Sequence, residues 1–117
     1  MASAAMTDKM IDLVARRFRT FGEPYRLRLL QELEPREQTV NELVHALDGN
    51  QPNVSKHLQI LHDAGIVTRR REGTSIVYGI CDPMVFRLCE LVCHSESKKS
   101  RLEFEALTGK MKSGAKR

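Results

Sequence analysis

Apolar side chains recur every three or four residues along most of the chain, which is the period of an amphipathic helix. Residues that begin and end helices separate these stretches. Thr39 and Glu42 match a capping box, Asn50 can cap the next helix, and Gly49 suits the left-handed conformation that ends a helix. The pattern predicts five helices, over residues 7–21, 24–34, 39–48, 50–65 and 84–95.

The period changes to two in the segments 66–71 and 75–81, where residues of different character alternate as they do in β-strands. Between these segments, Glu72-Gly73-Thr74 suits a turn, so we expect a β-hairpin. The order helix, helix, helix-turn-helix, hairpin, helix is that of a winged helix-turn-helix domain, in which the hairpin is the wing. The predicted fold class is therefore mainly α with a small β-hairpin.

The length of 117 residues suits one domain, which we expect over residues 1–117, and it excludes a large barrel enzyme. We expect an ordered core over 7–95 and a tail over 96–117, in which a short helix precedes a frayed basic end. No apolar run approaches the roughly 20 residues of a membrane span, and the first residues do not form a secretory signal. We therefore expect a cytoplasmic protein without a membrane partner.

One face of the predicted fourth helix carries Val54, Leu58 and Leu61 at core spacing, and the opposite face is polar. Amides and a hydroxyl on that polar face can bond base edges in a DNA major groove, and a lysine can neutralise a phosphate. The alternative is a face that meets only water, but the adjacent basic segment and the net charge of +4 favour DNA. We expect these DNA contacts at Gln51, Asn53, Ser55, Lys56 and Gln59.

Three consecutive arginines, Arg69, Arg70 and Arg71, lie on the first strand of the predicted wing. Because side chains alternate along a strand, at least one arginine faces each side, and Glu72 alone cannot pair them all. Beside DNA they would contact phosphates or reach the narrow minor groove. The alternative is an edge strand that carries charge to prevent aggregation.

Apolar residues surround the predicted last helix almost completely and leave only Arg87, Glu90 and His94 as a polar stripe. One small domain cannot cover such a helix, so we expect a second subunit to cover it. The predicted assembly is a homodimer through the first and last helices. A two-fold dimer would place two recognition helices about one turn of DNA apart, so that it reads two short half-sites.

Several segments of the chain resemble a known family. They are residues 23–30 (EPYRLRLL), 51–58 (QPNVSKHL) with Leu61 and 65–67 (GIV), and 70–78 in the wing. They resemble the ArsR/SmtB family of bacterial metal-responsive and thiol-responsive repressors over about residues 18–93. The resemblance implies a dimeric winged-helix repressor that releases double-stranded operator DNA when an inducer binds. His57, Gly73 and Thr74 lie in these segments and complete the set of residues that we expect at the DNA.

The inducer sites of the family do not match this chain. Arsenic and cadmium sensors of the family carry Cys-x-Cys near the start of the third helix, where this chain has Thr39 and Asn41. Neither residue supplies a thiolate for a soft ion. Zinc sensors carry an Asp and a His two residues later in the last helix, but here Asp82 is followed by Met84. We therefore expect neither of these two sites.

Three cysteines remain, Cys81, Cys89 and Cys93, and their odd number and close spacing indicate thiols rather than a disulfide framework. Three thiolates could bind As(III) or another soft metal ion, whereas redox or persulfide chemistry needs two sulfurs. A Cys89–Cys93 disulfide would distort the helix, because i, i+4 neighbours lie about 5–6 Å apart at Cβ and a disulfide needs about 4 Å. The alternative is that the cysteines are small apolar side chains at an interface.

Parts of the sequence suggest alternatives to a DNA-binding regulator with a thiol-based inducer. Ser55 and His57 suggest an enzyme, but two residues apart on a helix they point about 160° apart and cannot act as nucleophile and base. We therefore expect no enzyme, and under this interpretation His57 packs beneath the helix turn. A winged helix used only for protein contacts is a second alternative, because a fold does not fix a function. A repressor without any thiol-based inducer is a third.

Overall fold

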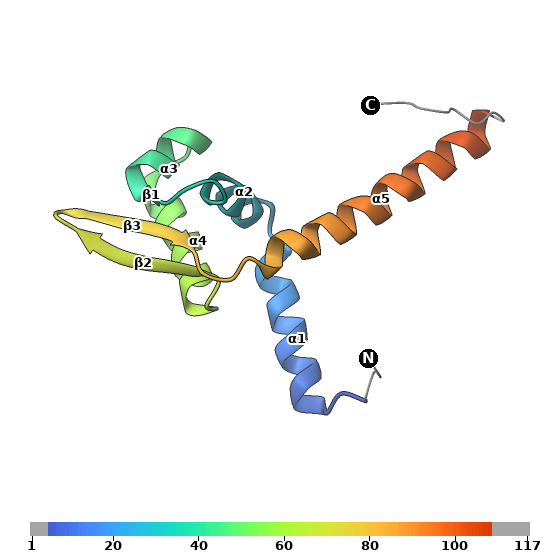
Figure 1. The fold of residues 1–117 in the computed structure, drawn as a ribbon, viewed down its shortest axis with the longest axis horizontal. Helices are drawn as coiled ribbons and strands as arrows, with labels where there is room; N and C mark the ends of the chain where they lie inside the picture. Colours follow the sequence, from blue (N-terminus) through green and yellow to red (C-terminus); the bar gives the residue numbers. More distant parts are fainter. Residues whose placement is uncertain (1–4, 109–117) are drawn as a thin grey trace. The chain divides into compact units, whose positions relative to one another are not determined.

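The computed structural model describes residues 5–108, which form five helices and a three-stranded antiparallel sheet. In chain order the elements are α1 (Asp8–Phe21), α2 (Pro24–Leu33), β1 (Gln38–Thr39), α3 (Val40–Leu47), α4 (Gln51–Asp63), β2 (Val67–Glu72), β3 (Ser75–Ile80) and α5 (Met84–Thr108) (Figure 1). The predicted order of helices and hairpin is confirmed. The chain divides after Pro83 into two units, of which the first holds α1 to β3 and the second holds α5.

Side-chain caps fix where the helices of the first unit begin. The Thr39 hydroxyl accepts a hydrogen bond from the Glu42 amide at 3.1 Å, and the Glu42 carboxylate accepts one from the Thr39 amide at 2.8 Å. These two bonds complete the predicted capping box of α3. The Asn50 side chain accepts a hydrogen bond from the Asn53 amide at 2.9 Å and so caps α4. Local bonds therefore decide the residues at which α3 and α4 start.

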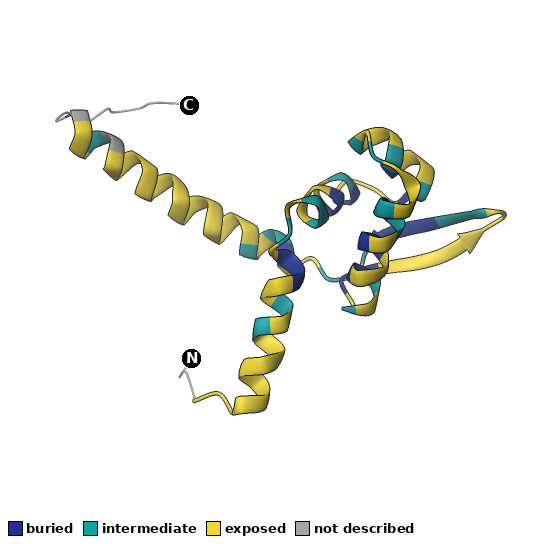
Figure 2. Ribbon diagram, turned by 180° about the vertical axis from the view of Figure 1, so that it is seen from behind, coloured by how far each residue is buried: buried dark blue, intermediate teal, exposed yellow. Residues whose placement is uncertain are grey.

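The core of the first unit consists mostly of aliphatic side chains, together with Phe21 and Tyr78, from its helices and from the wing. Figure 2 shows the buried positions gathered on the end of α1, on α2, on α4 and on β3. The predicted stripe of α4 is confirmed, since Val54, Leu58 and Leu61 are fully buried. The other fully buried side chains of this core are Leu29, Leu30, Leu33, Leu43 and Ile66. Burial of this stripe turns the opposite face of α4 outward.

The sheet has the strand order β1-β3-β2, and the hairpin reaches past the helices at its base (Figure 1). Glu72 pairs with Ser75, so the connecting loop has two residues, Gly73 and Thr74, and is shorter than predicted. Gly73 has φ +65°, a conformation that glycine adopts without strain. The sequence did not predict β1, because a strand of two residues is too short to show a period.

Helix α5 is longer than the sequence predicts. It runs without interruption from Met84 to Thr108 as a helix of 25 residues, whereas the expected end was near residue 95. The segment 96–108 contains no proline or glycine and is rich in Glu, Lys, Arg and Leu, which are good helix formers. Near residue 95 the sequence becomes more polar, but this change does not end the helix. The basic end expected to fray, 110–117, lies outside the described residues.

None of the helices in residues 5–108 is both long enough and apolar enough to cross a membrane.

Candidate nucleic-acid interface

The turn between α3 and α4 is held by its backbone and by the space around Gly49. Asp48, not Gly49, takes the left-handed conformation, with φ +51°, which corrects the predicted reason for the glycine. The Gly49 amide donates to the Val44 carbonyl at 3.0 Å. A Cβ at Gly49 would collide with the Tyr25 hydroxyl, so the site has no room for a side chain at this position. This close approach sets how α4 follows α3.

The outward face of α4 carries polar side chains, as predicted. Gln51, Lys56 and Gln59 are exposed, and Asn53 and Ser55 are half-buried. This set offers amide, hydroxyl and ammonium groups, which can bond base edges and neutralise a phosphate. The geometry of α4 is therefore suited to a DNA major groove.

His57 lies on a different side of α4 from this polar set. The residue is only 8% exposed, and its Nδ1 atom lies 3.3 Å from Nη1 of Arg26. Burial is the largest cause that lowers the pKa of His57, and the nearby positive charges of Arg26 and Lys56 lower it further. The interpretation that this ring packs beneath the helix is confirmed. The same placement gives no support to its inclusion among the DNA contacts.

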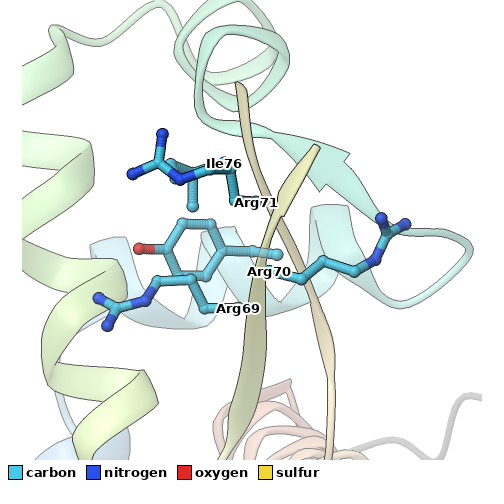
Figure 3. A pocket seen from close by; sticks show the side chains of 5 residues that line it. Arg69, Arg70, Arg71 and Ile76 are labelled. Carbon is cyan, nitrogen blue, oxygen red and sulfur yellow. The ribbon is translucent and has the colours of Figure 1, made fainter. Parts of the chain in front are cut away.

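The arginines of the wing point to two sides of the hairpin. Figure 3 shows Arg69 and Arg71 on one side with Ile76, and Arg70 on the opposite side. The alternation follows the register, which pairs Arg69 with Tyr78 and Arg71 with Ile76 across the strands. All three arginines, Ile76 and Tyr78 line an open hollow on the wing. Two guanidinium groups are thus presented together on one side.

Arg70 is held by two carboxylates. Its guanidinium donates to Glu72 at 2.6 Å and to Glu37 at 2.7 Å. Both carboxylates raise the pKa of Arg70 above its ordinary value. Glu37 lies just before β1 and also covers Gly79, where an added Cβ would come within 2.8 Å of its side chain. Arg70 therefore ties the wing to the segment before β1.

A polar contact joins the wing to the recognition helix. Nη1 of Arg69 donates to Oε1 of Gln59 at 2.7 Å, and Nε2 of Gln59 donates to Oδ1 of Asp63 at 2.8 Å. All of these side chains are exposed. The contact brings the predicted DNA-reading groups of two elements, one from α4 and one from β2, to the same place.

The sequence from residue 21 to residue 70 matches a protein family described as a helix-turn-helix domain. The chain is 40% identical over 91 residues to a probable mercury resistance operon repressor from Streptomyces lividans, covering 78% of this chain and 73% of that protein. It also matches a homodimeric winged helix-turn-helix DNA-binding domain from Mycobacterium bovis, described as a possible ArsR-family transcriptional regulator. That match has a TM-score of 0.68 and 32% identity, over 82% of this chain and 92% of that chain. This chain belongs to the ArsR/SmtB family.

A further structural relative of the regulator is the AntR antimony-specific transcriptional repressor. Its crystal structure matches with a TM-score of 0.72 and 31% identity, over 86% of this chain and 92% of that chain. These relatives are transcriptional regulators, and this chain is a DNA-binding transcriptional regulator with a winged helix-turn-helix fold. The family and the fold class predicted from the sequence are both confirmed.

The three cysteines of the regulator are free and exposed. Cys89 and Cys93 lie one turn apart on α5, and Cys81 follows β3 in the other unit. Burial of part of the side chain raises the pKa of the Cys89 thiol, and Cys93 raises it further. Residues 5–108 contain no cluster of three or more His, Cys, Asp or Glu side chains that could hold a metal ion. A site that combines all three thiolates, one of the alternatives left open by the sequence, stays a hypothesis.

Two residues that organise this candidate interface, Glu37 and Arg26, are not predicted from the sequence. Glu37 is separated from Arg70 by 33 positions, and no local pattern links the two. Arg26 lies in the segment 23–30 that carries the family resemblance, so a signal was present, but its contacts with α1 and α4 were not visible.

Proposed function

We propose that this regulator is a homodimeric repressor that holds double-stranded operator DNA with the outward face of α4 and one side of the wing. The contact of 2.7 Å between Gln59 and Arg69 carries the proposal, because it places the polar groups of both elements at one surface. On this surface the amides and hydroxyl of α4 read base edges, and Lys56, Arg69 and Arg71 contact phosphates or the minor groove.

The proposal divides the predicted DNA-contacting residues into two groups. Arg70 anchors the wing through its two carboxylates, and His57 is kept from the surface by burial. Gly73 and Thr74 form the exposed tip of the wing, where their backbone can approach a phosphate. The proposed DNA contacts are Gln51, Asn53, Ser55, Lys56, Gln59, Arg69, Arg71, Gly73 and Thr74.

Exposed apolar side chains support the dimer. Phe18 of α1 is 55% exposed and Leu91 of α5 is 70% exposed, although both side chains are apolar. The other large exposed apolar side chains of these helices are Met10, Ile11, Leu13, Val14, Met84, Val92, Leu102 and Leu107. Exposed apolar side chains in such number on each of the two helices are typical of contacts with another protein, and a second copy can cover them on both protomers. The homodimeric relative from Mycobacterium bovis supports the same arrangement.

Selection from a pool of random duplexes tests the proposed DNA binding. The regulator should enrich a sequence with two related half-sites about one helical turn apart, and anisotropy should show weaker binding as salt rises. A winged helix used only for protein contacts would enrich no sequence and would bind duplexes weakly at low salt. Either of those results contradicts the proposal.

Release of the operator is proposed to follow a soft metal ion or an oxidant at Cys89 and Cys93. Both thiols are exposed and lie one turn apart, so one thiophilic ion can reach both sulfurs. The names of two relatives, a mercury resistance repressor and an antimony-specific repressor, support a soft ion. Because release follows from binding alone, the function needs no catalytic step. Such a regulator acts where the operator lies, which we take to be the cytoplasm.

A Cys89→Ser, Cys93→Ser double variant tests this inducer site. It should bind the selected duplex as wild type does, while arsenite, cadmium, diamide and polysulfide fail to release it. The matched control is Cys81→Ser, which should still be released. If no compound releases the wild type, or if the double variant is released equally well, the regulator has no inducer at these thiols.

A further inference from the structure

Arg26 of α2 contacts two other helices, α1 and α4. Its Nε atom donates to the Thr20 carbonyl at 2.8 Å, and Nη2 donates to the Arg19 carbonyl at 3.5 Å. These carbonyls belong to the last turn of α1, where helix carbonyls have no partner in a following turn, although the Arg19 carbonyl also accepts from the Gly22 amide at 3.2 Å. The remaining nitrogen, Nη1, lies 3.3 Å from Nδ1 of His57 on α4. One guanidinium thus joins the end of α1 to the recognition helix.

The contact favours one protonation state of His57. A guanidinium has only donors, so a hydrogen bond from Arg26 requires Nδ1 to accept, and the tautomer that allows this is the neutral ring with its proton on Nε2. The ring also lies against Tyr25, with 5.3 Å between the ring centroids. Because the residue is only 8% exposed, His57 has little contact with water. A second proton on the ring, at Nδ1, would replace this hydrogen bond with repulsion between two cations.

A second contact joins α1 to α4. Nη1 of Arg17 donates at 2.8 Å to the carbonyl of Ala64, the residue that ends α4. Arg17 therefore holds the end of the recognition helix, while Arg26 holds its middle. Both helices belong to the first unit of the chain, and α1 also carries part of the exposed apolar surface proposed for the dimer.

We propose that Arg26 and His57 are positioning residues for DNA recognition, which fix α4 relative to α1 through a bond that exists only while the His57 ring is neutral. The inference rests on the proposed function, in that α4 must be the helix that reads the operator. Through this bond, the position of α1, which is proposed to take part in the dimer, determines the position of α4, which is proposed to enter the major groove.

The charges around His57 set the direction of its pH dependence. Arg26 and Tyr25 face the ring from α2, Glu23 lies at the start of α2, and Lys56 precedes the ring on α4. Burial, Arg26 and Lys56 lower the pKa of His57 below the ordinary 6.5, and Glu23 opposes them. The neutral ring and its bond to Arg26 are therefore complete above pH 6.5 and are lost as the pH falls through the lowered pKa.

The first test compares Arg26→Gln with Arg28→Gln, an exposed arginine two residues along the same helix. Affinity is measured for the duplex enriched by selection and for a scrambled duplex of the same length. Arg26→Gln should bind the selected duplex about fivefold or more weakly, at the lower end of typical coupling between sites. Its affinity for the scrambled duplex should stay unchanged, because no phosphate contact is lost. Arg28→Gln should keep the wild-type ratio of the two affinities.

The second test uses His57 variants between pH 7.5 and 5.5. His57→Leu removes the acceptor and should lose preference for the selected duplex at every pH. In His57→Asn the side-chain carbonyl can accept from Arg26 and does not titrate, so it should recover preference lost in His57→Leu and show no decline with acid. Wild type should lose preference as the pH falls. His45→Asn, which removes an exposed histidine from α3, should decline as wild type does.

The possible outcomes distinguish a failure of the proposed function from a failure of the positioning role alone. A wild-type protein that prefers no duplex overturns the proposed function, and the positioning role with it. If wild type is selective but Arg26→Gln keeps the full ratio, or His57→Asn declines with acid as wild type does, only the positioning role is overturned. Equal losses of Arg26→Gln on both duplexes would indicate a plain loss of folding or charge and would also overturn it.

Discussion

At the scale of single residues, position in the fold decides which of several similar side chains is free to meet DNA. Lys56 and His57 are adjacent in the sequence, but Lys56 is exposed whereas the ring of His57 is buried against Arg26. The exposed ammonium can approach a phosphate, and the buried imidazole cannot. Adjacent residues on one helix therefore have different roles.

Lys56→Ala should weaken binding to every duplex and reduce the slope of log K against log salt by about one unit, as expected for one lost phosphate contact. Gln51→Ala should instead relax the base preference with little change in slope. Anisotropy titrations at several salt concentrations measure both effects. Lys98→Ala on α5 is the control and should keep the wild-type slope. An unchanged slope in Lys56→Ala would mean that α4 does not face the phosphates.

The thiols of α5 lead to a prediction about pH. Metal ions bind thiolates, and the raised pKa keeps Cys89 protonated at neutral pH, so a metal ion must displace its proton. Cadmium should therefore release the operator more readily at higher pH, with its apparent affinity rising about tenfold per pH unit for each displaced proton. Titrations of the DNA complex with cadmium at pH 6.5 and 7.5 measure this. Equal cadmium affinity at both values would exclude these thiols as the ligands.

At the scale of elements, the wing and the helix-turn-helix depend on close contacts between segments that are distant in the sequence. Arg70 binds Glu37 before β1, and Gly49 in the turn is packed against Tyr25 of α2. These contacts hold the two elements proposed to bind DNA against the same helical core. Changes at these contacts should therefore have effects that the local sequence does not indicate.

Arg70 and Arg71 should differ although they are neighbours on β2. Arg71→Ala should reduce the salt slope of DNA binding by about one unit, because its side chain is proposed to contact a phosphate. Arg70→Ala should keep the slope of wild type, because Glu37 and Glu72 already hold its guanidinium. The two variants remove the same charge, so each is the control of the other. A larger change of slope in Arg70→Ala would reverse the assignment.

Gly49→Ala should destabilise the regulator by about 1–3 kcal/mol, because the new Cβ overlaps with the Tyr25 hydroxyl. This hydroxyl is buried and has no hydrogen-bond partner in the described structure, so Tyr25→Phe alone should cost little. The double variant should recover much of the stability lost in Gly49→Ala. Urea unfolding of the four proteins measures the coupling. Additive effects of the two substitutions would show that the hydroxyl is not the obstacle.

At the scale of the whole molecule, the exposed apolar surfaces of α1 and α5 make a second copy the expected partner. Val92 is 53% exposed and lies on the apolar part of α5, whereas His94 belongs to the polar stripe predicted from the sequence. The pattern that predicted the dimer therefore also distinguishes substitutions that should break it from those that should not.

Val92→Glu should shift the regulator from dimer to monomer, because a charge buried without a partner costs about 3–5 kcal/mol. Sedimentation velocity over a range of concentrations measures the shift. His94→Glu adds a carboxylate two residues away on the polar stripe and should remain dimeric. A Val92→Glu protein as dimeric as wild type would place the interface on another surface.

The sequence by itself determined the features that depend on neighbouring residues. The caps of α3 and α4, the apolar stripe of α4 and the hairpin were all predicted, because capping bonds span three residues and periodicity appears within one element. The polar face of α4 followed from the stripe opposite to it. The end of α5 was missed because a change in polarity was mistaken for a change in structure.

Only the tertiary structure decided which polar residues are available and which are occupied. Arg26 and His57 are 31 positions apart, and Arg70 and Glu37 are 33 apart. No periodicity or capping signal extends over such distances, since these contacts form only when the core brings separate helices and strands together. The burial of His57 and the pairing of Arg70 therefore cannot be predicted from the sequence, in which both are ordinary polar residues.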